Sequence, residues 1–237
     1  MRMQNWLRNQ WTRLNTETIG TDRYWSLAVQ NASHFHAMQP VLARYASGRL
    51  LDVGAGRLAW RNALLPHCSQ YLCSDLAPEH ADLNLRFDAT RGWPLRDGAL
   101  NTLFLCSVLE HVPEPWACLR EAARVLAPGG VVLLSTPFLF YLHGEPNDYY
   151  RFSPYAIARL ADDAGLEVVE MVPEGGLFHL LLNAVSVPIS CVLYTLRLTR
   201  LISASTRFLE WVARALDTGD RRRIYACNTI AVLRRPG

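Results

Sequence analysis

The stretch RLLDVGAG, residues 49–56, decides the fold that this sequence predicts. A short apolar run that stops at two closely spaced glycines is typical of a buried strand followed by a sharp turn. Glycine lets the backbone turn and lets a ligand approach without a Cβ in the way. Since ligands of open α/β sheets bind at the carboxyl ends of the strands, this turn is the first candidate for a binding site.

Strand and helix patterns alternate on both sides of this stretch. Further strands are expected at residues 71–74, 85–87, 102–106, 131–135, 166–172 and 225–233, with helices at 115–126 and 154–164. Pro128-Gly129-Gly130 is expected to stop the first of these helices. Strands that alternate with helices predict a parallel sheet covered on both faces.

Composition narrows the classes of protein that this chain can be. Half of the 237 residues are hydrophobic and 19% are charged, which suits one ordered domain with an insertion. The net charge of +3 is too small for a nucleic-acid-binding surface. The six cysteines form no C-x-x-C pair, so we expect no metal site and reduced thiols. Without the apolar stretch of a secretory signal, a cytoplasmic location is expected.

The two ends of the chain are expected to add helices to the sheet. Residues 1–46 are predicted to form an N-terminal helical cap, followed by one domain over 47–237 with an apolar helical insertion at about 176–216. Gly175–Leu196 carries no formal charge and is followed by Arg197. The segment is long enough to span a bilayer, but its polar residues favour other interpretations. These are contact with the inner face of the cytoplasmic membrane, a homodimer contact, or a lid over an apolar substrate pocket.

Acidic residues end the next two strands after the glycine turn. Asp75 lies where a carboxylate can accept both hydroxyls of a ribose, and Asp88 lies where it can accept a hydrogen bond from an exocyclic amine. The same pattern fits a nicotinamide dinucleotide site, which expects G-x-G-x-x-G and allows Ala59 at the third position.

The order of motifs resembles a known family. LLDVGAG, CSDLAPEH, FDATRGWPL, LFLCSVLEHVPEP and LREAARVLAPGGVVLLSTP together resemble class I S-adenosylmethionine-dependent methyltransferases of the small-molecule type, over roughly residues 49–172. The tail HGEPNDYYRFSPYAIARL resembles bacterial members encoded among cell-surface polysaccharide genes. The resemblance implies an α/β, Rossmann-like fold whose seven-stranded, mostly parallel sheet has an antiparallel last strand. The nicotinamide reading leaves the EHVPEP and PGG segments unexplained.

The resemblance also implies a cofactor site. S-adenosylmethionine, released as S-adenosylhomocysteine, would be held by Asp52, Gly54, Ala55, Gly56, Asp75, Leu76, Asp88, Ala89, Ser107, Leu109 and Glu110. The glycines would pass under its methionine portion, Asp75 would hold the ribose, and Asp88 would bind the adenine edge. Two departures stand out. Leu58 replaces a third glycine common in the family, which is compatible with cofactor binding if the turn after Gly56 takes a different path. The helix between Asp75 and Asp88 must be short.

A polar loop after the fifth strand is the candidate acceptor site. The residues assigned to substrate binding are Phe138, Asp148, Tyr149, Tyr150 and Arg151. An acceptor hydroxyl is a poor nucleophile until its proton is accepted, so His143 is the candidate base and His111 the competing one. The alternative is structural: Asp148 pairs with Arg151, the tyrosines pack the loop, and the histidines orient backbone.

These residues predict O-methylation of a small-molecule, glycan or lipid-linked acceptor. The acceptor is expected to have an apolar part because of the uncharged insertion. The rival hypothesis is a non-catalytic methyltransferase-like scaffold that binds the cofactor or a partner. Leu58 favours the scaffold, whereas acidic residues at two strand ends favour a working cofactor site.

Overall fold

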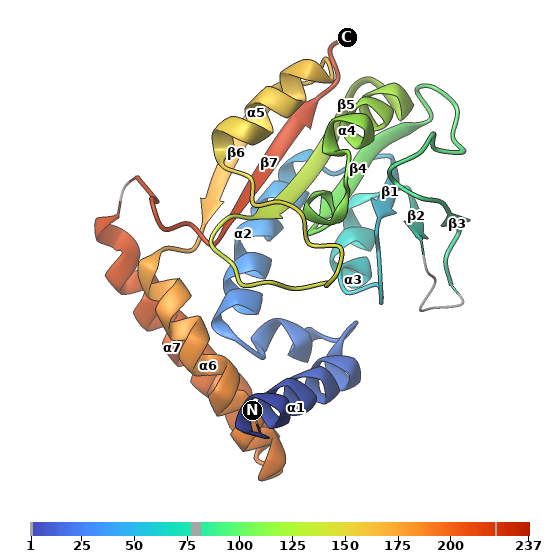
Figure 1. Ribbon diagram of the computed structural model, residues 1–237. Coiled ribbons are helices and arrows are strands. Elements are labelled where there is room, and N and C mark those ends of the chain that lie inside the picture. Colours follow the sequence, from blue (N-terminus) through green and yellow to red (C-terminus); the bar gives the residue numbers. More distant parts are fainter. Residues whose placement is uncertain (1, 77–81, 221) are drawn as a thin grey trace. The chain divides into compact units, whose positions relative to one another are not determined.

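The computed structural model describes residues 2–76, 82–220 and 222–237 of the chain (Figure 1). The chain divides into two compact units. The first consists of Met1–Ala37 and Glu174–Cys227, and the second of Met38–Pro173 and Asn228–Gly237. Helix α2 (Val29–Tyr45) begins in the first unit and ends in the second.

A seven-stranded sheet forms the centre of the second unit. Its order is β3-β2-β1-β4-β5-β7-β6. The strands are β1 (Arg49–Val53), β2 (Gln70–Asp75), β3 (Leu85–Arg86), β4 (Leu100–Cys106), β5 (Leu126–Pro137), β6 (Glu167–Glu174) and β7 (Asn228–Arg234). Strands β1 to β5 pair in parallel, and β7 runs antiparallel to β5. The predicted sheet, with its antiparallel last strand, is confirmed.

Register brings the carboxyl ends of the first strands to one edge. Val53 at the end of β1 pairs with Ser74 on β2, and Ser74 pairs in turn with Leu85 on β3. On the other side of β1, Asp52 pairs with Phe104 on β4. The loops after β1, β2, β3 and β4 therefore lie at the same edge of the sheet. Strands β2 and β3 lie on one side of β1 and β4 on the other, and ligands of such sheets bind where the order switches sides.

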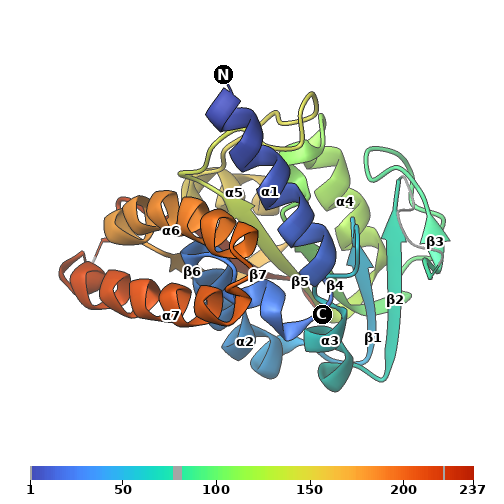
Figure 2. The ribbon, with the colours of Figure 1, turned by 90° about the horizontal axis from the view of Figure 1, so that it is seen from below.

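Helices cover both faces of this sheet (Figure 2). Helices α4 (Pro115–Val125) and α5 (Pro154–Asp163) lie on one face, and α3 (Arg61–Leu64) lies on the other. Proline at its first position suits the start of α4, where its missing N–H costs no hydrogen bond. The buried residues of α4 recur every three or four positions: Pro115, Cys118, Leu119, Ala122 and Val125. They pack against inward side chains of β4 and β5 in one hydrophobic core.

Some element boundaries differ from those predicted. Strand β5 begins directly after α4, so Pro128-Gly129-Gly130 lies inside the strand rather than before it. The extra length pairs Leu126 with Leu100, and Gly129 relieves the irregular stretch with a φ of +77°. The last strand begins at Asn228 instead of residue 225. The short helix expected between Asp75 and Asp88 falls partly on residues 77–81, outside the described residues.

The first unit is helical. It contains α1 (Arg2–Thr18), the 3-10 turn η1 (Asp22–Ser26), the start of α2, α6 (Leu177–Thr195), α7 (Thr199–Leu216) and the turn η4 (Asp217–Gly219). Leu14, Leu27 and Ile202 form its apolar centre. The N-terminal and inserted helices are both found as predicted. Their grouping differs, because the insertion was assigned to the 47–237 domain and instead forms one unit with the N-terminal helices.

Polar residues of α6 explain this grouping. The Ser186 hydroxyl accepts a hydrogen bond from the backbone N–H of Val29, and the Asn183 side chain accepts one from Gln30. Both donors belong to the first turn of α2, where backbone N–H groups lack helical partners. Ser190 donates to the Leu27 carbonyl. The polar side chains of α6, which argued against a membrane-spanning helix, therefore point into the first unit.

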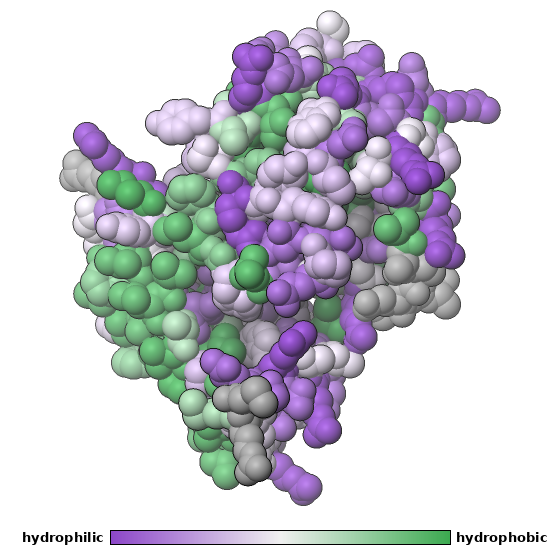
Figure 3. Space-filling view, in the orientation of Figure 1, coloured by the Kyte–Doolittle hydropathy of each residue, from purple (hydrophilic) through white to green (hydrophobic). Residues whose placement is uncertain are grey.

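The outer face of α6 and α7 is apolar, as Figure 3 shows. Its exposed residues include Leu181, Val185, Val192, Leu196, Leu198, Leu201, Phe208, Trp211 and Leu216. By length and composition α6 is able to cross a membrane. In its most apolar stretch, 28% is buried. This helix is thus polar inside and apolar outside, the reverse of an ordinary surface helix.

Candidate active site

A cavity of about 270 Å³ lies at the carboxyl edge of the sheet. It is lined by Val53, Gly54, Ser74, Asp75, Leu76, Phe87, Asp88, Ala89, Thr90, Ser107, Val108, His111, Val112 and Asn147. Its size is close to the lower limit of about 300 Å³ for sites that bury small ligands. Apolar walls with a few convergent carboxylates suit a ligand with a flat base and a polyhydroxyl part.

The backbone approaches the cavity at two strained positions. Gly54 has a φ of +67°, and a Cβ placed on it would lie 2.7 Å from Cγ2 of Val108. Ser107 has a φ of +55°, unusual for a residue with a side chain, and its N–H donates to the Ser135 carbonyl at 2.9 Å. Both residues line the cavity. Gly54 is therefore required twice, for its conformation and for the space beside it.

Asp75 fixes the glycine turn. Its Oδ2 accepts a 2.8 Å hydrogen bond from the N–H of Gly56, and the N–H of Ala55 donates to the Ser74 carbonyl at 2.9 Å. Asp75 also lines the cavity, whereas Ala55 and Gly56 lie outside the lining. The carboxylate predicted to hold a ribose thus also joins the ends of β1 and β2.

Leu58 adopts a backbone conformation that is typical of glycine. Its φ is +58°, in the left-handed region that residues other than glycine, asparagine and aspartate rarely adopt. The side chain is 8% exposed and belongs to the core. Burial of the leucine therefore holds the backbone in this strained form.

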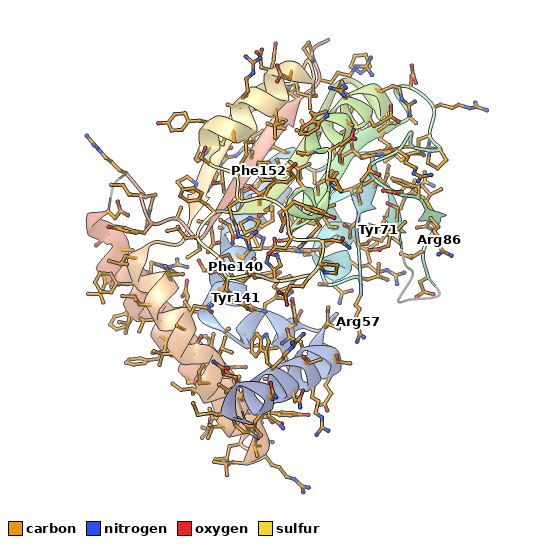
Figure 4. The ribbon with its side chains drawn as sticks, viewed as in Figure 1. Arg57, Tyr71, Arg86, Phe140, Tyr141 and Phe152 are labelled. Atoms are coloured by element: carbon orange, nitrogen blue, oxygen red, sulfur yellow. The ribbon has the colours of Figure 1, made fainter. Side chains whose placement is uncertain are left out.

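Asp52 is not among the residues that line the cavity. The carboxylate is buried, and Tyr71 Oη donates a 2.9 Å hydrogen bond to its Oδ2. Burial raises the pKa of Asp52 to about 7, although the Tyr71 hydrogen bond opposes the shift. Figure 4 labels Tyr71 on β2. Asp52 is thus a structural carboxyl beside the site and does not contact the cavity.

The predicted adenine-binding residues lie on the cavity wall. Thr90 donates to Asp88 Oδ1 through its N–H at 2.9 Å and its hydroxyl at 2.7 Å, which lowers the pKa of Asp88. Leu76 and Ala89 line the cavity beside it. Leu109 does not, because it is fully buried in the core. Val53, Phe87 and Val112 are apolar wall residues that sequence reasoning missed, since an apolar side chain carries no signal of its own for ligand contact.

The loop after β5 is held by an ion pair. Arg151 binds Asp148 with two nitrogens at 2.6 and 2.8 Å and donates to the carbonyls of Phe140 and Tyr141. Its guanidinium holds the pKa of Asp148 well below the usual range. Phe140 and Tyr141, labelled in Figure 4, stack with ring centroids 4.2 Å apart. The structural alternative for Asp148 and Arg151 is therefore what the structure contains.

The other predicted acceptor residues also bond within the loop. Tyr149 Oη donates to Asn147 Oδ1 at 2.9 Å, and Tyr150 Oη donates to the Pro113 carbonyl at 2.8 Å. Phe138 begins the loop, half-buried. None of the predicted substrate residues is among those that line the cavity. Asn147, which does line it, was missed because asparagine in a loop usually indicates only a turn.

The two candidate bases share one buried carboxylate. Nε2 of His143 lies 3.5 Å and Nε2 of His111 lies 3.8 Å from Oε1 of Glu110, whose side chain is fully buried. Interaction with Glu110 raises the pKa of His143. The rings of His111 and His143 pack edge to face, with their centroids 4.8 Å apart. The sequence could not place these three side chains together, because His143 comes from a different segment.

Comparison with known proteins supports the interpretation of this site. Residues 51–134 match a family model described as a methyltransferase domain. A ubiquinone biosynthesis O-methyltransferase of Xanthomonas oryzae pv. oryzae is 31% identical over 121 residues, which is 43% of this chain and 51% of the relative. This part of the chain is therefore similar to methyltransferase domains.

Solved structures share the fold. An S-adenosylmethionine-dependent methyltransferase from Archaeoglobus fulgidus aligns with a TM-score of 0.59, at 14% identity, over 94% of this chain and 99% of that one. The [4+2]-cyclase SpnF aligns with a TM-score of 0.56, at 17% identity, over 87% and 82%. A protein with this fold thus bears the name of a different reaction. The chain also spans about half the length of the curated relatives it matches. Activity and acceptor are therefore argued from the site itself.

Proposed function

We propose that this methyltransferase transfers the methyl group of S-adenosylmethionine to a hydroxyl oxygen of a small-molecule acceptor that has an apolar part. The observation that carries the proposal is the cavity at the carboxyl edge, with Asp75, Asp88 and His111 in its wall and His143 against His111. When bound, the cofactor supplies the methyl carbon: the acceptor oxygen bonds to it, the C–S bond breaks with its electron pair passing to sulfur, and the hydroxyl proton is released to solvent.

The residues of the cavity fit the parts of this cofactor. Asp75 offers carboxylate oxygen to the ribose hydroxyls at the end of β2, and Asp88 offers it to the adenine amine. Phe87, Val112 and Leu76 supply apolar surface for the base. The exposed backbone at Gly54 leaves room for the methionine portion. The protein's own contribution is alignment and removal of water, because the cofactor carries the reactive group.

The acceptor hydroxyl is activated at the rim of the cavity. His111 lines the cavity, and its ring meets that of His143 over the buried carboxylate of Glu110. We therefore assign activation to these three residues as a unit, in place of one histidine acting alone. The relatives named for ubiquinone biosynthesis support an O-methyl acceptor with an apolar tail. Lipid-linked glycans satisfy the same requirement.

Release of S-adenosylhomocysteine from purified protein tests this proposal. Prenylated phenols and lipid-linked sugars are offered as two acceptor sets, with wild type and Asp75→Ala compared. Acceptor-dependent release that the Asp75→Ala variant loses supports the methyltransferase. If wild type binds neither S-adenosylmethionine nor its product, the non-catalytic scaffold becomes the better account.

We further propose that the outer face of α6 and α7 contacts the cytoplasmic membrane surface, where such acceptors would be presented. Phe208 and Trp211 on this face are 61% and 65% exposed. Arg197, Arg200 and Arg207 are exposed beside them. Exposed aromatic residues flanked by arginines suit the boundary between acyl chains and anionic headgroups. Glu210, the acidic residue of α7, is buried and paired with Arg214.

Flotation with liposomes tests the membrane contact. Wild type is expected to float with vesicles rich in phosphatidylglycerol and to stay behind with neutral vesicles at raised salt. Replacing both Phe208 and Trp211 by Ser is expected to abolish flotation, whereas Arg159→Ser, an exposed arginine on α5, leaves it unchanged. A stable dimer in detergent-free solution that ignores vesicles would assign this face to self-association instead.

A further inference from the structure

We propose that Glu110, His111 and His143 bind a divalent transition-metal ion whose open coordination positions face the cofactor cavity. The inference rests on the proposed function only for the ion's role, because the site itself is defined by these three side chains. Their donor atoms lie within 4.8 Å of one another. Two imidazoles and one carboxylate are a donor set typical of zinc, iron and related ions.

Glu110 is the strongest indication that a cation belongs here. Its carboxylate is 0% exposed, and neither oxygen has a hydrogen-bond partner among the described residues. A buried carboxylate without hydrogen-bond partners is costly, and such groups are normally paired closely or bound to metal. Glu110 is held in place by its main chain, since its carbonyl accepts from Tyr149 N at 2.9 Å and Tyr150 N at 3.3 Å.

Both histidines direct Nε2 toward this carboxylate. His111 Nδ1 lies 2.6 Å from the Asn147 carbonyl, and His143 Nδ1 lies 3.2 Å from the Tyr141 carbonyl. A carbonyl oxygen only accepts hydrogen bonds, so each Nδ1 carries a hydrogen, and loss of any proton from Nε2 leaves that nitrogen able to bind an ion. Metal-binding histidines are oriented in this way, with the second nitrogen donating to a backbone carbonyl.

The distances favour an ion over a proton. Nε2 of His143 and of His111 lie 3.5 and 3.8 Å from Glu110 Oε1, beyond the usual ~2.7–3.2 Å of an N–H···O hydrogen bond. Ligand atoms about 2.1 Å from a tetrahedral ion lie about 3.4 Å apart. Small rotations of the two rings therefore bring all three atoms to a shared ion.

The position of the site gives the ion a role. His111 and Asn147 line the cavity, so the open positions of the ion face the place where the acceptor would meet the cofactor. An ion there binds the acceptor hydroxyl, lowers its pKa, and lets its proton pass to solvent water before the oxygen attacks. This proposal departs from the expectation of no metal site, which rested on the cysteine pattern, because the donors come from two segments without cysteine.

Zinc and cobalt binding to chelator-treated protein tests the site without cofactor or acceptor. Wild type is expected to take one equivalent of Zn²⁺ from a chromophoric chelator and to prefer it over Mg²⁺. Co²⁺ is expected to give visible absorption of a low-coordinate site. In long-range ¹H–¹⁵N spectra, two of the 7 histidines are expected to shift at Nε2 on adding Zn²⁺.

Variants locate the binding. His143→Gln and Glu110→Gln are expected to weaken Zn²⁺ binding by about tenfold or more, since each removes one of three ligands. His143 is partly exposed, so its variant tests the site even if Glu110→Gln fails to fold. His36→Gln is the control, because His36 also lies 3.6 Å from a carboxylate, that of Glu210.

The outcomes distinguish a failure of the metal-site proposal from a failure of the proposed function. No Zn²⁺ binding, or binding that both ligand variants retain, overturns the metal site even if S-adenosylmethionine binds. Zn²⁺ binding that the ligand variants lose, in a protein that ignores S-adenosylmethionine, supports the metal site and contradicts the proposed function.

Discussion

Gly54 lies directly against Val108: a methyl group on its Cα would come within 2.7 Å of Val108 Cγ2. Gly56 has a similar left-handed φ of +50° but no atom within 4 Å of such a methyl group. We expect Gly54→Ala to weaken S-adenosylhomocysteine binding by about tenfold or more and Gly56→Ala by much less, since both add backbone strain but only the first also fills the cavity wall. Calorimetry of both variants measures this. Equal losses would contradict the account of the cavity.

At Leu58 we expect the glycine variant to be more stable than the alanine variant, the reverse of the usual order. Leu58→Ala loses buried surface and keeps the strain of φ +58°, whereas Leu58→Gly loses slightly more surface but relieves roughly 1–2 kcal/mol of strain. The glycine variant is therefore expected to be the more stable of the two in urea. At Leu64, a buried α3 residue with φ −83°, the same pair should show glycine less stable by about 1 kcal/mol. The same order at both positions would disprove strain at Leu58.

Asp52 makes stability depend on pH. Its pKa in the folded protein is about 7, above the ordinary value of 3.8, so the folded state binds more protons between these values. Its contribution is fully present below about pH 4 and is lost as pH rises through about 7, by at most about 1.4 kcal/mol per pH unit. We expect the difference in unfolding free energy between wild type and Asp52→Asn to change over this window. A constant difference would show that Asp52 is ionised when folded.

Arg151 is expected to order the loop after β5. Arg151→Lys cannot span Asp148 and the carbonyls of Phe140 and Tyr141 together, so amide hydrogen exchange over residues 138–150 should quicken by about tenfold. Arg159→Lys, in an exposed pair with Asp163, is the control and should leave exchange unchanged. Unchanged protection in Arg151→Lys would mean that packing alone holds the loop.

The features that could be predicted from the sequence are those that depend on a short stretch of residues. Strand β1 and its glycine turn, and the carboxylates Asp75 and Asp88 at strand ends, could be predicted because each depends on local pattern and on the geometry of parallel sheets. The resemblance added the antiparallel position of β7. The interior position of Asp52 could not be predicted, since an acidic residue at a strand end predicts exposure and only Tyr71 and burial reverse it.

Contacts between distant segments were the part that could not be predicted. Glu110 and His143 are separated by β5, and no local pattern shows that their side chains meet. The pairing of α6 with the first turn of α2 has the same cause, because Asn183 and Ser186 look like interruptions of an apolar helix until their partners are known. The sequence identified these residues as unusual without indicating what they bind.

Binding of S-adenosylmethionine and S-adenosylhomocysteine, measured by calorimetry on wild type and Asp75→Ala, tests the central claim most directly. Asp82→Ala, an exposed carboxylate 3.6 Å from Arg61, is the matched control. The account predicts binding of roughly −8 kcal/mol, a micromolar Kd, that Asp75→Ala weakens by at least about tenfold and Asp82→Ala leaves unchanged. A folded wild-type protein that binds neither compound would contradict it.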